Sequence, residues 1–333
     1  MCIRDRSENI LEVKNLKAYY DILKGQVKAV DNVTFNLKKG EILGLAGESG
    51  CGKSTLASTF ISRKKPLKYI SGEVDLVGNK IMQMSEEEFK ELRLRTISLI
   101  PQYALDAFSP TKKIKTYIAD LARQHGIKTD KEFFDKVKER LDLVNLDESV
   151  LNRYSIELSG GMKQRVIMVI STILDPEFLI ADEITSALDV SSQRFVATML
   201  ANLRDLGIIK SSIFITHDLS ILYQIADRIM IMYAGNFAEI GPTDEIVDNP
   251  RHPYTRALID SLPKVGIQYK DKRLSGIEGT PPHLLNIEEG CRFRHRCPYA
   301  IDKCEETPER EKVAEDHFVS CWRWKELGSD LNG

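Results

Sequence analysis

The sequence predicts an α/β protein built on a mostly parallel central sheet with helices on both faces. Short apolar strands alternate with helical patterns along the chain, as expected for such a fold. A glycine-rich loop at residues 47–55 stands between a buried strand and a helix. Another buried strand, at residues 178–181, runs directly into two carboxylates. Together these features indicate a phosphate-binding α/β domain.

The bulk composition narrows the class of protein. With 333 residues the chain has room for about two domains. Its 42% hydrophobic and 29% charged residues are typical of a folded globular protein. The net charge of 47 − 49 = −2 provides no overall basic field to recruit nucleic acid. No apolar run approaches the ~20 residues that a bilayer requires, so we do not expect the chain to span a membrane.

The first residues are set apart from the rest. Residues 1–6 lack the apolar core of a secretory signal and fit poorly with the residues after them. We interpret them as a non-native scar and leave them out of the fold. We expect a cytosolic protein, an environment that argues against disulfides between its six cysteines.

Apolar patterning places the strands. Residues 10–16 and 27–37 alternate apolar and polar side chains, which predicts half-buried strands of an antiparallel β subdomain. Continuous apolar runs predict buried strands at five further places: 41–46, 96–100, 178–181, 212–216 and 229–233. Helical patterns separate these runs, which predicts the mostly parallel central sheet.

A helical subdomain is expected at about residues 104–158. Five apolar side chains recur there at helical spacing with charged residues opposite, and we interpret them as core packing. They are Phe133, Phe134, Val137, Leu141 and Val144. No internal repeat is visible, so we expect one nucleotide-binding domain, over residues 7–248.

The loop at residues 47–55 carries phosphate-binding chemistry. Its pattern, G-x-x-x-x-G-K-S, turns backbone N–H groups toward phosphates at a helix N-terminus. We expect Lys53 to reach the β- and γ-phosphates, Ser54 to hold Mg²⁺, and Thr55 to assist at the α/β-phosphates. The other nucleotide contacts expected in this loop are Gly47, Ser49, Gly50, Cys51 and Gly52.

Polar residues at three strand ends complete a candidate hydrolytic site. Asp182 is expected to contact Mg²⁺ through water, and Glu183 to polarise the attacking water. Gln102 follows one buried strand and is expected to contact both Mg²⁺ and the water. His217 follows another strand and is expected to hydrogen-bond the γ-phosphate. Gln102 and His217 taken singly would be ordinary surface residues, and only their order and spacing favour these roles.

The segment Leu158–Arg165, with the sequence LSGGMKQR, opens a helix shortly before the acidic pair. With the phosphate loop, Gln102, Asp182-Glu183, Ser186–Asp189 and His217, it makes the chain resemble the nucleotide-binding subunit of an ATP-binding cassette (ABC) transporter. The resemblance covers roughly residues 8–245. It implies nucleotide contacts from Ser159, Gly160, Gly161 and Asp189, and an adenine-stacking aromatic at Tyr20, with Tyr19 the less favoured candidate.

By this resemblance, two such domains sandwich two ATP molecules head to tail. Each site joins the phosphate loop of one subunit to Ser159 and Gly161 of the other. Closure on ATP and opening after hydrolysis then drive an attached permease. The chain has Ile184 where the family usually has proline, and we expect a small adjustment of the following turn with activity retained.

The C-terminal part narrows the resemblance. The segment Arg251–Leu258, followed by Leu262-Pro263, resembles the C-terminal extension of dipeptide/oligopeptide-permease ATP-binding subunits. We therefore expect an extension over residues 249–333.

The extension contains four cysteines: Cys291, Cys297, Cys304 and Cys321. Their spacing lacks the tight pairs typical of zinc and ferredoxin sites. We expect three neighbouring arginines, Arg292, Arg294 and Arg296, to favour thiolates and offset the charge of a cluster. Because some members of this subfamily bind a [4Fe–4S] cluster, that is the expected cofactor. Zinc, with His295 or His317 as further ligands, and free buried thiols are the alternatives.

The sequence thus predicts the ATPase subunit of a peptide importer, peripheral at the cytoplasmic face of the membrane. The expected partners are a second ATPase subunit, identical or homologous, two transmembrane permease subunits and an extracytoplasmic solute-binding protein, without nucleic acid. One alternative is that the same ATPase subunit drives uptake of oligosaccharides or nickel chelates. A soluble regulatory ATPase that senses redox state through an iron–sulfur cluster is another. A soluble cassette acting on ribosomes or DNA is disfavoured, since tandem cassettes and long coiled-coil insertions are absent.

Overall fold

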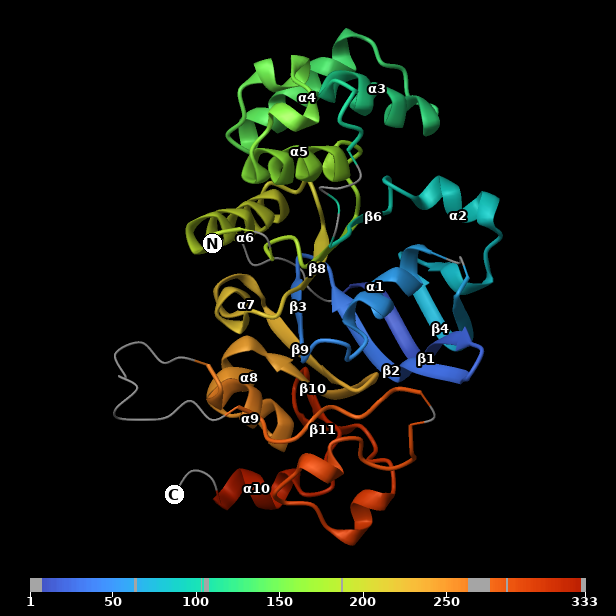
Figure 1. The fold of residues 1–333 in the computed structure, drawn as a ribbon, viewed down its shortest axis with the longest axis vertical. Coiled ribbons are helices and arrows are strands. Elements are labelled where there is room, and N and C mark those ends of the chain that lie inside the picture. The colour runs from blue at the N-terminus through green and yellow to red at the C-terminus, as the bar shows by residue number, and fades with distance from the viewer. Residues whose placement is uncertain are drawn as a thin grey trace. The chain divides into compact units, whose positions relative to one another are not determined.

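The computed structural model describes residues 8–62, 65–102, 104, 108–186, 188–262, 276–285 and 287–330. The predicted scar at residues 1–6 lies outside them. The chain divides into two compact units. Figure 1 labels their helices and strands. The first unit comprises Met1–Ile10, Lys38–Gly40 and Gln83–Phe214, and the second comprises Leu11–Leu37, Glu41–Met82 and Ile215–Gly333. No helix in the described segments has the length and apolar character needed to cross a membrane.

The first unit combines parallel strands with a group of helices. Strands β6 and β7 pair in parallel, with Ile97 opposite Phe178 and Ile100 opposite Ala181, and β8 follows β7 in the sheet order. These elements are α2 (Glu86–Leu92), β6 (Ile97–Ile100), α3 (Ile114–Gln124), α4 (Lys131–Leu143), α5 (Gly160–Thr172), β7 (Phe178–Asp182), α6 (Val190–Asp205) and β8 (Ser211–Ile215). Two 3₁₀ turns, Glu148–Asn152 and Ser155–Glu157, lie between α4 and α5.

Helix α4 shows why the helical region folds as it does. The side chain of Asp130 accepts a hydrogen bond from the backbone N–H of Phe133 at 3.1 Å, which caps the first turn. Phe133, Val137 and Leu141 are buried, so the predicted apolar face is confirmed. Phe134 is only half-buried and packs edge-on against Phe133.

The second unit contains an antiparallel sheet with the strand order β2-β1-β4-β5. Its elements are β1 (Asn9–Ile22), β2 (Gly25–Lys38), β4 (Leu67–Leu76), β5 (Asn79–Lys80) and the 3₁₀ turn Ile81–Gln83. The two predicted half-buried strands are confirmed, each longer than expected. Strand β4 was not anticipated from the sequence. It pairs antiparallel with β1, with Leu11 opposite Leu76 at one end and Tyr20 opposite Leu67 at the other.

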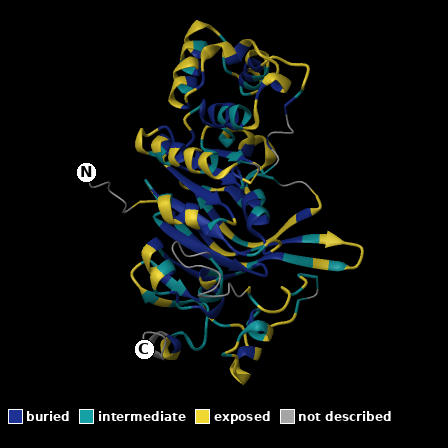
Figure 2. Ribbon diagram, turned by 60° about the vertical axis from the view of Figure 1, so that its left-hand side comes forward, coloured by how far each residue is buried: buried dark blue, intermediate teal, exposed yellow. Residues whose placement is uncertain are grey.

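The same unit carries a second set of strands in the order β11-β12-β10-β9-β3. Strand β3 runs parallel to β9, and both are fully buried, as their dark blue colour in Figure 2 indicates. These elements are β3 (Ile42–Ala46), α1 (Lys53–Ile61), α7 (Leu219–Ile225), β9 (Arg228–Tyr233), β10 (Asn236–Pro242), α8 (Thr243–Asp248), α9 (Pro253–Asp260), β11 (Glu311–Ala314), β12 (His317–Val319) and α10 (Trp324–Asp330).

The cysteine-bearing C-terminal segment is joined to this sheet. Strand β12 pairs antiparallel with β10, with Glu239 opposite Val319, and β11 pairs with β12. Two 3₁₀ turns, Arg294–Arg296 and Asp302–Glu305, precede these strands. None of β10, β11 and β12 was anticipated, because strands of three to seven residues leave little periodicity to detect.

A buried ion pair ties the start of β9 to the residue before β3. Arg228 donates from Nε and from a terminal nitrogen to the two carboxylate oxygens of Glu41, at 2.6 and 3.1 Å. The two side chains are 6% and 2% exposed. Arg228 also donates to the backbone carbonyl of Asn36 at 2.7 Å, so one guanidinium links three strand segments of the unit.

Replacing Glu41 with alanine should therefore leave the buried Arg228 guanidinium without its carboxylate partner. We expect Glu41→Ala to lower the free energy of unfolding by about 3–5 kcal/mol, measured by chemical denaturation. The control is Glu8→Ala, which removes a solvent-exposed pair with Lys39 and should cost at most about 1 kcal/mol. Equal losses in the two variants would contradict the prediction.

Candidate functional site

The phosphate loop is held in a conformation that requires glycine. It leaves the end of β3 at Gly47 and enters α1 at Lys53. Gly47 has φ 145° and Gly52 has φ 107°, both in the region that side chains disfavour. A Cβ at Gly47 would clash with the backbone carbonyl of Met232, and one at Gly52 with that of Ala29. Close packing against neighbouring main chain therefore dictates both glycines.

Lys53 lies within the curve of this loop. Its side chain is buried, and Nζ donates to the backbone carbonyls of Gly47 at 2.7 Å and Glu48 at 3.1 Å. The thiol of Cys51 lies 3.7 Å from the same Nζ, and burial raises its pKa despite that nearby charge. The loop thus surrounds the ammonium group of Lys53.

The two candidate aromatics differ in their surroundings. The Tyr20 hydroxyl lies 3.2 Å from Thr55 Oγ1, so its half-buried ring stands beside the end of the loop. Tyr19 is buried and donates its hydroxyl proton to Asp31 at 2.6 Å. Of the two, only Tyr20 combines proximity to the loop with partial exposure.

His217 follows β8 and is exposed. The backbone N–H of the preceding residue, Thr216, bonds to the carbonyl of Leu45 at 3.4 Å. Leu45 belongs to β3, the strand that leads into the phosphate loop. The segment that contains His217 therefore starts beside that strand.

Two predicted catalytic residues meet in the first unit. Gln102, just beyond β6, donates from Nε2 to Oε2 of Glu183 at 2.7 Å. Glu183 follows β7 with φ 47°, a left-handed conformation that costs free energy in a non-glycine residue and concentrates at functional sites. Its carbonyl accepts bonds from the backbone N–H and hydroxyl of Ser186, which closes the turn after Ile184. Asp182, the last residue of β7, is buried.

The serine–glycine–glycine segment opens α5 as predicted. Ser159 is the N-cap, and its hydroxyl accepts from the backbone N–H of Met162 at 3.3 Å. Nothing lies within 4 Å of the Cβ positions of Gly160 and Gly161, so this helix start presents bare main chain on an open surface. Asp189 caps α6, and its hydrogen bonds with Ser192 lower its pKa.

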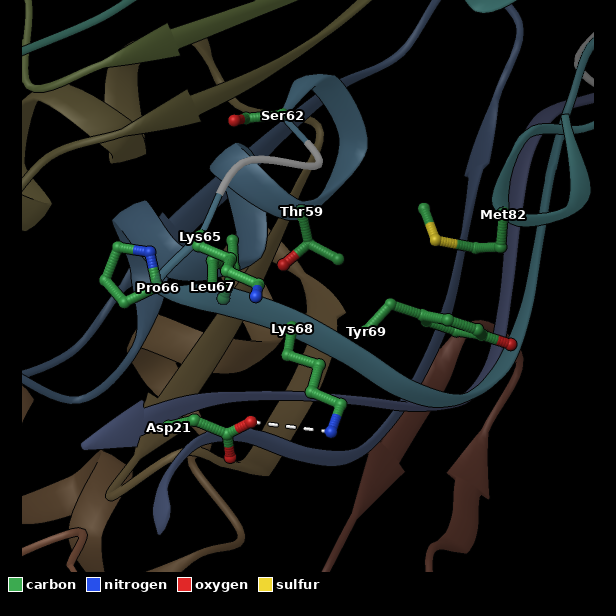
Figure 3. Close-up of a pocket in the computed structure, with 9 residues that line it drawn as sticks. All are labelled: Asp21, Thr59, Ser62, Lys65, Pro66, Leu67, Lys68, Tyr69 and Met82. Carbon is green, nitrogen blue, oxygen red and sulfur yellow. Dashed lines mark ion pairs between the residues drawn. The ribbon is translucent and has the colours of Figure 1, made fainter. Parts of the chain in front are cut away.

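A pocket of about 350 Å³ is lined by Gly161 and Arg165 at the start of α5. A cavity of about 600 Å³ in the second unit is lined by residues of β1, α1 and β4, among them Thr59 and Tyr69, and by Met82 of the 3₁₀ turn Ile81–Gln83 (Figure 3). Asp21 and Lys68 form an ion pair of 3.4 Å at its edge. No residue of the phosphate loop lines it, so it plays no part in the candidate site.

Two contacts to the loop were missed from the sequence. The backbone N–H of Glu48 donates to the hydroxyl of Tyr254 in α9 at 2.8 Å. The carboxylate of Glu48 receives two hydrogen bonds from Arg296, at 2.7 and 3.0 Å. No local pattern signals either partner, because each stands more than 200 residues from Glu48 in the sequence.

The four cysteines of the C-terminal segment lie close together. The charges of Cys291, Cys297 and Cys304 would each raise the pKa of Cys321, and the Cys291 N–H donates to the Cys304 carbonyl at 2.9 Å. Burial raises the pKa of Cys291 to about 11 and that of Cys321 to about 12. These two thiols are therefore neutral at pH 7 in this structure.

The prediction that nearby arginines favour thiolates is wrong. Arg292 pairs with Asp31, Arg294 with Glu288, and Arg296 with Glu48. Each guanidinium is occupied by a carboxylate, and so it does not offset the effect of burial on the thiols.

A site for one metal ion is not preformed. Among the described residues, no three His, Cys, Asp or Glu side chains are grouped so as to hold an ion. The alternative zinc ligands each lie beside a carboxylate: His317 is buried against Glu239 at 2.8 Å, and His295 is exposed beside Glu288.

Comparisons with known proteins agree with this geometry. The family described as "ABC transporter" matches residues 30–186, and "Oligopeptide/dipeptide transporter, C-terminal region" matches residues 238–304. The dipeptide transport ATP-binding protein of Caldanaerobacter subterraneus is 37% identical over 95% of this chain and 98% of its own length. The chain belongs to the ATP-binding subunits of ABC transporters, in the oligopeptide/dipeptide branch. It is an ABC-type ATPase.

Further relatives extend over the full cassette and its C-terminal segment. An oligopeptide transport ATP-binding protein of Bacillus subtilis is 39% identical over 94% of this chain and 97% of its own length. A solved ATP-binding cassette, a dimer bound to ADP and phosphate in a post-hydrolysis state, superposes with a TM-score of 0.62 at 24% identity, covering 70% of this chain and 98% of that one. The predicted ABC fold is confirmed.

A buried histidine caps helix α9, the helix whose Tyr254 contacts Glu48 of the phosphate loop. His252 caps α9, with Nδ1 accepting from the backbone N–H of Tyr254 at 3.0 Å. Burial lowers its pKa to about 4, although the Glu239 charge and a hydrogen bond involving Ser320 act in the opposite direction. The imidazole is therefore neutral, as an acceptor must be.

This shift predicts a pH-dependent stability. Because the unfolded chain binds a proton at His252 near pH 6.5 and the folded chain only near pH 4, stability falls as the pH is lowered between these values. We expect this group to lower the free energy of unfolding by about 2 kcal/mol from pH 7 to pH 5. In His252→Asn, which keeps a cap acceptor without titrating, the decrease should be smaller by that amount. Parallel pH profiles for the two proteins, measured by denaturation, would contradict the assignment.

Proposed function

We propose that the chain is the ATP-hydrolysing subunit of an importer that takes up peptides, bound peripherally at the cytoplasmic face of the membrane. The peptide cargo is supported by the relatives, which are dipeptide and oligopeptide transport ATP-binding proteins. The observation that carries the hydrolytic role is the contact between Gln102 and Glu183, since it holds a carboxylate at the end of a buried strand.

In this proposal the predicted site residues divide the steps of ATP binding and hydrolysis among them. Glu183 polarises the attacking water, and Gln102 orients both the water and the carboxylate. Lys53 and the loop N–H groups bind the phosphates, while His217 contacts the γ-phosphate. Ser54, Gln102 and Asp182 hold Mg²⁺, which neutralises phosphate charge when bound. Tyr20 stacks on the adenine.

The bare start of α5 supports a role across a subunit interface. Its open N–H groups and the positive end of the helix are suited to a phosphate carried by another molecule. We propose that Ser159, Gly160 and Gly161 contact the nucleotide of a second ATPase subunit, with Asp189 near the same interface. Two permease subunits and an extracytoplasmic solute-binding protein complete the proposed transporter.

One variant tests both the chemistry and the cargo. Glu183→Gln should bind Mg²⁺–ATP normally while kcat falls at least about 100-fold, because the amide cannot act as a base. In the native host, replacing the chain with this variant should abolish uptake of a radiolabelled dipeptide.

The outcomes separate the two claims. Normal hydrolysis by Glu183→Gln would remove Glu183 from the mechanism. If the variant loses hydrolysis but dipeptide uptake is unchanged, the assignment of ATPase activity stands and the proposed peptide cargo is refuted. Lys53→Ala serves as the matched variant, since it should instead lose affinity for ATP.

We also propose that Cys291, Cys297, Cys304 and Cys321 bind a [4Fe–4S] cluster. Their convergence supports it, and a cluster of four irons needs more room between its thiolates than one ion does. Bound iron would compensate the thiolates that burial disfavours here.

Metal analysis after anaerobic purification tests this proposal. We expect a broad absorption band near ~400 nm with about four irons and four sulfides per chain. Cys321→Ser should lose this band. About one zinc per chain without colour would assign a structural clip instead, and protein without metal would leave four buried thiols.

A further inference from the structure

A single arginine of the cysteine-bearing segment reaches the phosphate loop. Arg296 donates to both carboxylate oxygens of Glu48, at 2.7 and 3.0 Å. Its remaining N–H groups bond to the hydroxyl of Tyr233 at 3.1 Å and to the carbonyls of Ile277 and Glu278 at 3.1 and 2.7 Å. All five guanidinium donors are thus used, which fixes the plane of the group.

The pair is well shielded from solvent. Arg296 is 5% exposed and Glu48 is 25% exposed. The guanidinium also lies over the rings of Tyr233 and Phe293, at 5.7 and 5.9 Å from their centroids. The hydrogen bonds with Glu48 raise the pKa of Arg296, so its charge is maintained. A fork-to-fork pair of this kind is both stronger and more directional than a surface salt bridge.

Glu48 is held by its backbone as well. Its N–H donates to the Tyr254 hydroxyl at 2.8 Å, and its carbonyl accepts from Lys53 Nζ at 3.1 Å. Tyr254 in turn packs against Tyr233 and Phe293, with centroids 4.5 and 5.4 Å apart. The position of Glu48 therefore depends on α9 and on the segment between Cys291 and Cys297.

A second arginine of the same segment supports the other side of the loop. Arg292 pairs with Asp31 and donates to the carbonyl of Ala234, at the turn between β9 and β10. In that turn the N–H of Gly235 donates to the carbonyl of Cys51, at 2.7 Å. Arg296 thus contacts the loop directly at Glu48, whereas Arg292 contacts the turn whose Gly235 bonds to Cys51.

We infer that Arg296 is a positioning residue of the ATPase, which sets the conformation of the phosphate loop through Glu48. The inference rests on the proposed phosphate-binding role of residues 47–55. Its physical basis is that Glu48 lies between Gly47, the first loop glycine, and Ser49, so that the loop N–H groups can be aligned with phosphate only if Glu48 stays in place. Loss of the pair should weaken binding of ATP more than it slows the chemical step.

The chain offers a matched control. Arg294 belongs to the same 3₁₀ turn, but its partners are Glu288 and the carbonyl of Glu289, both within the C-terminal segment. Arg294→Gln therefore removes one guanidinium from the turn without touching the loop.

The experiment measures the Kd for Mg²⁺–ATP by equilibrium dialysis, together with kcat and KM for hydrolysis, on the full-length chain. We expect Arg296→Gln and Glu48→Gln each to raise Kd and KM about tenfold, as for loss of charge-assisted hydrogen bonds. For Arg296→Gln, kcat should remain within about twofold of wild type. The double variant should bind no more weakly than the weaker single variant, since both remove one interaction. Arg294→Gln should bind as wild type does.

Several outcomes would overturn the inference. They are an unchanged Kd in folded Arg296→Gln, additive losses in the double variant, or an equal loss in Arg294→Gln. If Arg296→Gln fails to fold, Arg296→Lys keeps the charge but not the two parallel bonds, and it should raise Kd by a smaller factor. Lys53→Ala separates the claims: if it binds ATP normally, the proposed phosphate loop itself fails, whatever Arg296 does.

Discussion

The architecture of the second unit depends on how closely its phosphate loop approaches neighbouring main chain. Gly47 and Gly52 leave no room for a side chain against Met232 and Ala29, and the Cys51 carbonyl is bonded to Gly235. Strands β2, β9 and the β9–β10 turn therefore shape the loop directly. A loop fixed by backbone contacts loses little entropy when a phosphate arrives, which suits a site whose chemistry is mostly positioning and electrostatics.

The C-terminal segment is continuous with this scaffold through one buried carboxylate. Glu239 in β10 accepts hydrogen bonds from the N–H groups of Arg251 and His252, at 2.8 and 2.9 Å, and faces His317 of β12 at 2.8 Å. It thereby joins the start of α9 to the added strand. Since α9 also presents Tyr254 to Glu48, the strand, the helix and the phosphate loop share a connected set of polar contacts.

Charge in the C-terminal segment is used differently from what its composition indicates. Four thiols and three arginines within a short stretch indicate a basic pocket for thiolates. Each arginine instead pairs with a carboxylate, two of which, Asp31 and Glu48, belong to the nucleotide-binding part of the unit. Cys291 and Cys321 remain in a desolvated pocket, and burial raises the pKa values of both thiols.

The sequence by itself determined the features whose physics is local. The glycine-rich loop between β3 and α1, the helix opened by the segment Leu158–Arg165, the apolar face of α4 and the carboxylates after β7 all depend on residue type and spacing over a few positions. Tertiary structure alone decided the attachment of β12 to β10, the different surroundings of Tyr19 and Tyr20, and the partners of the arginines. Arg296 and Glu48 are 248 residues apart, and a contact over that separation leaves no periodic trace. Which carboxylate a guanidinium meets is settled only when folding removes both from water.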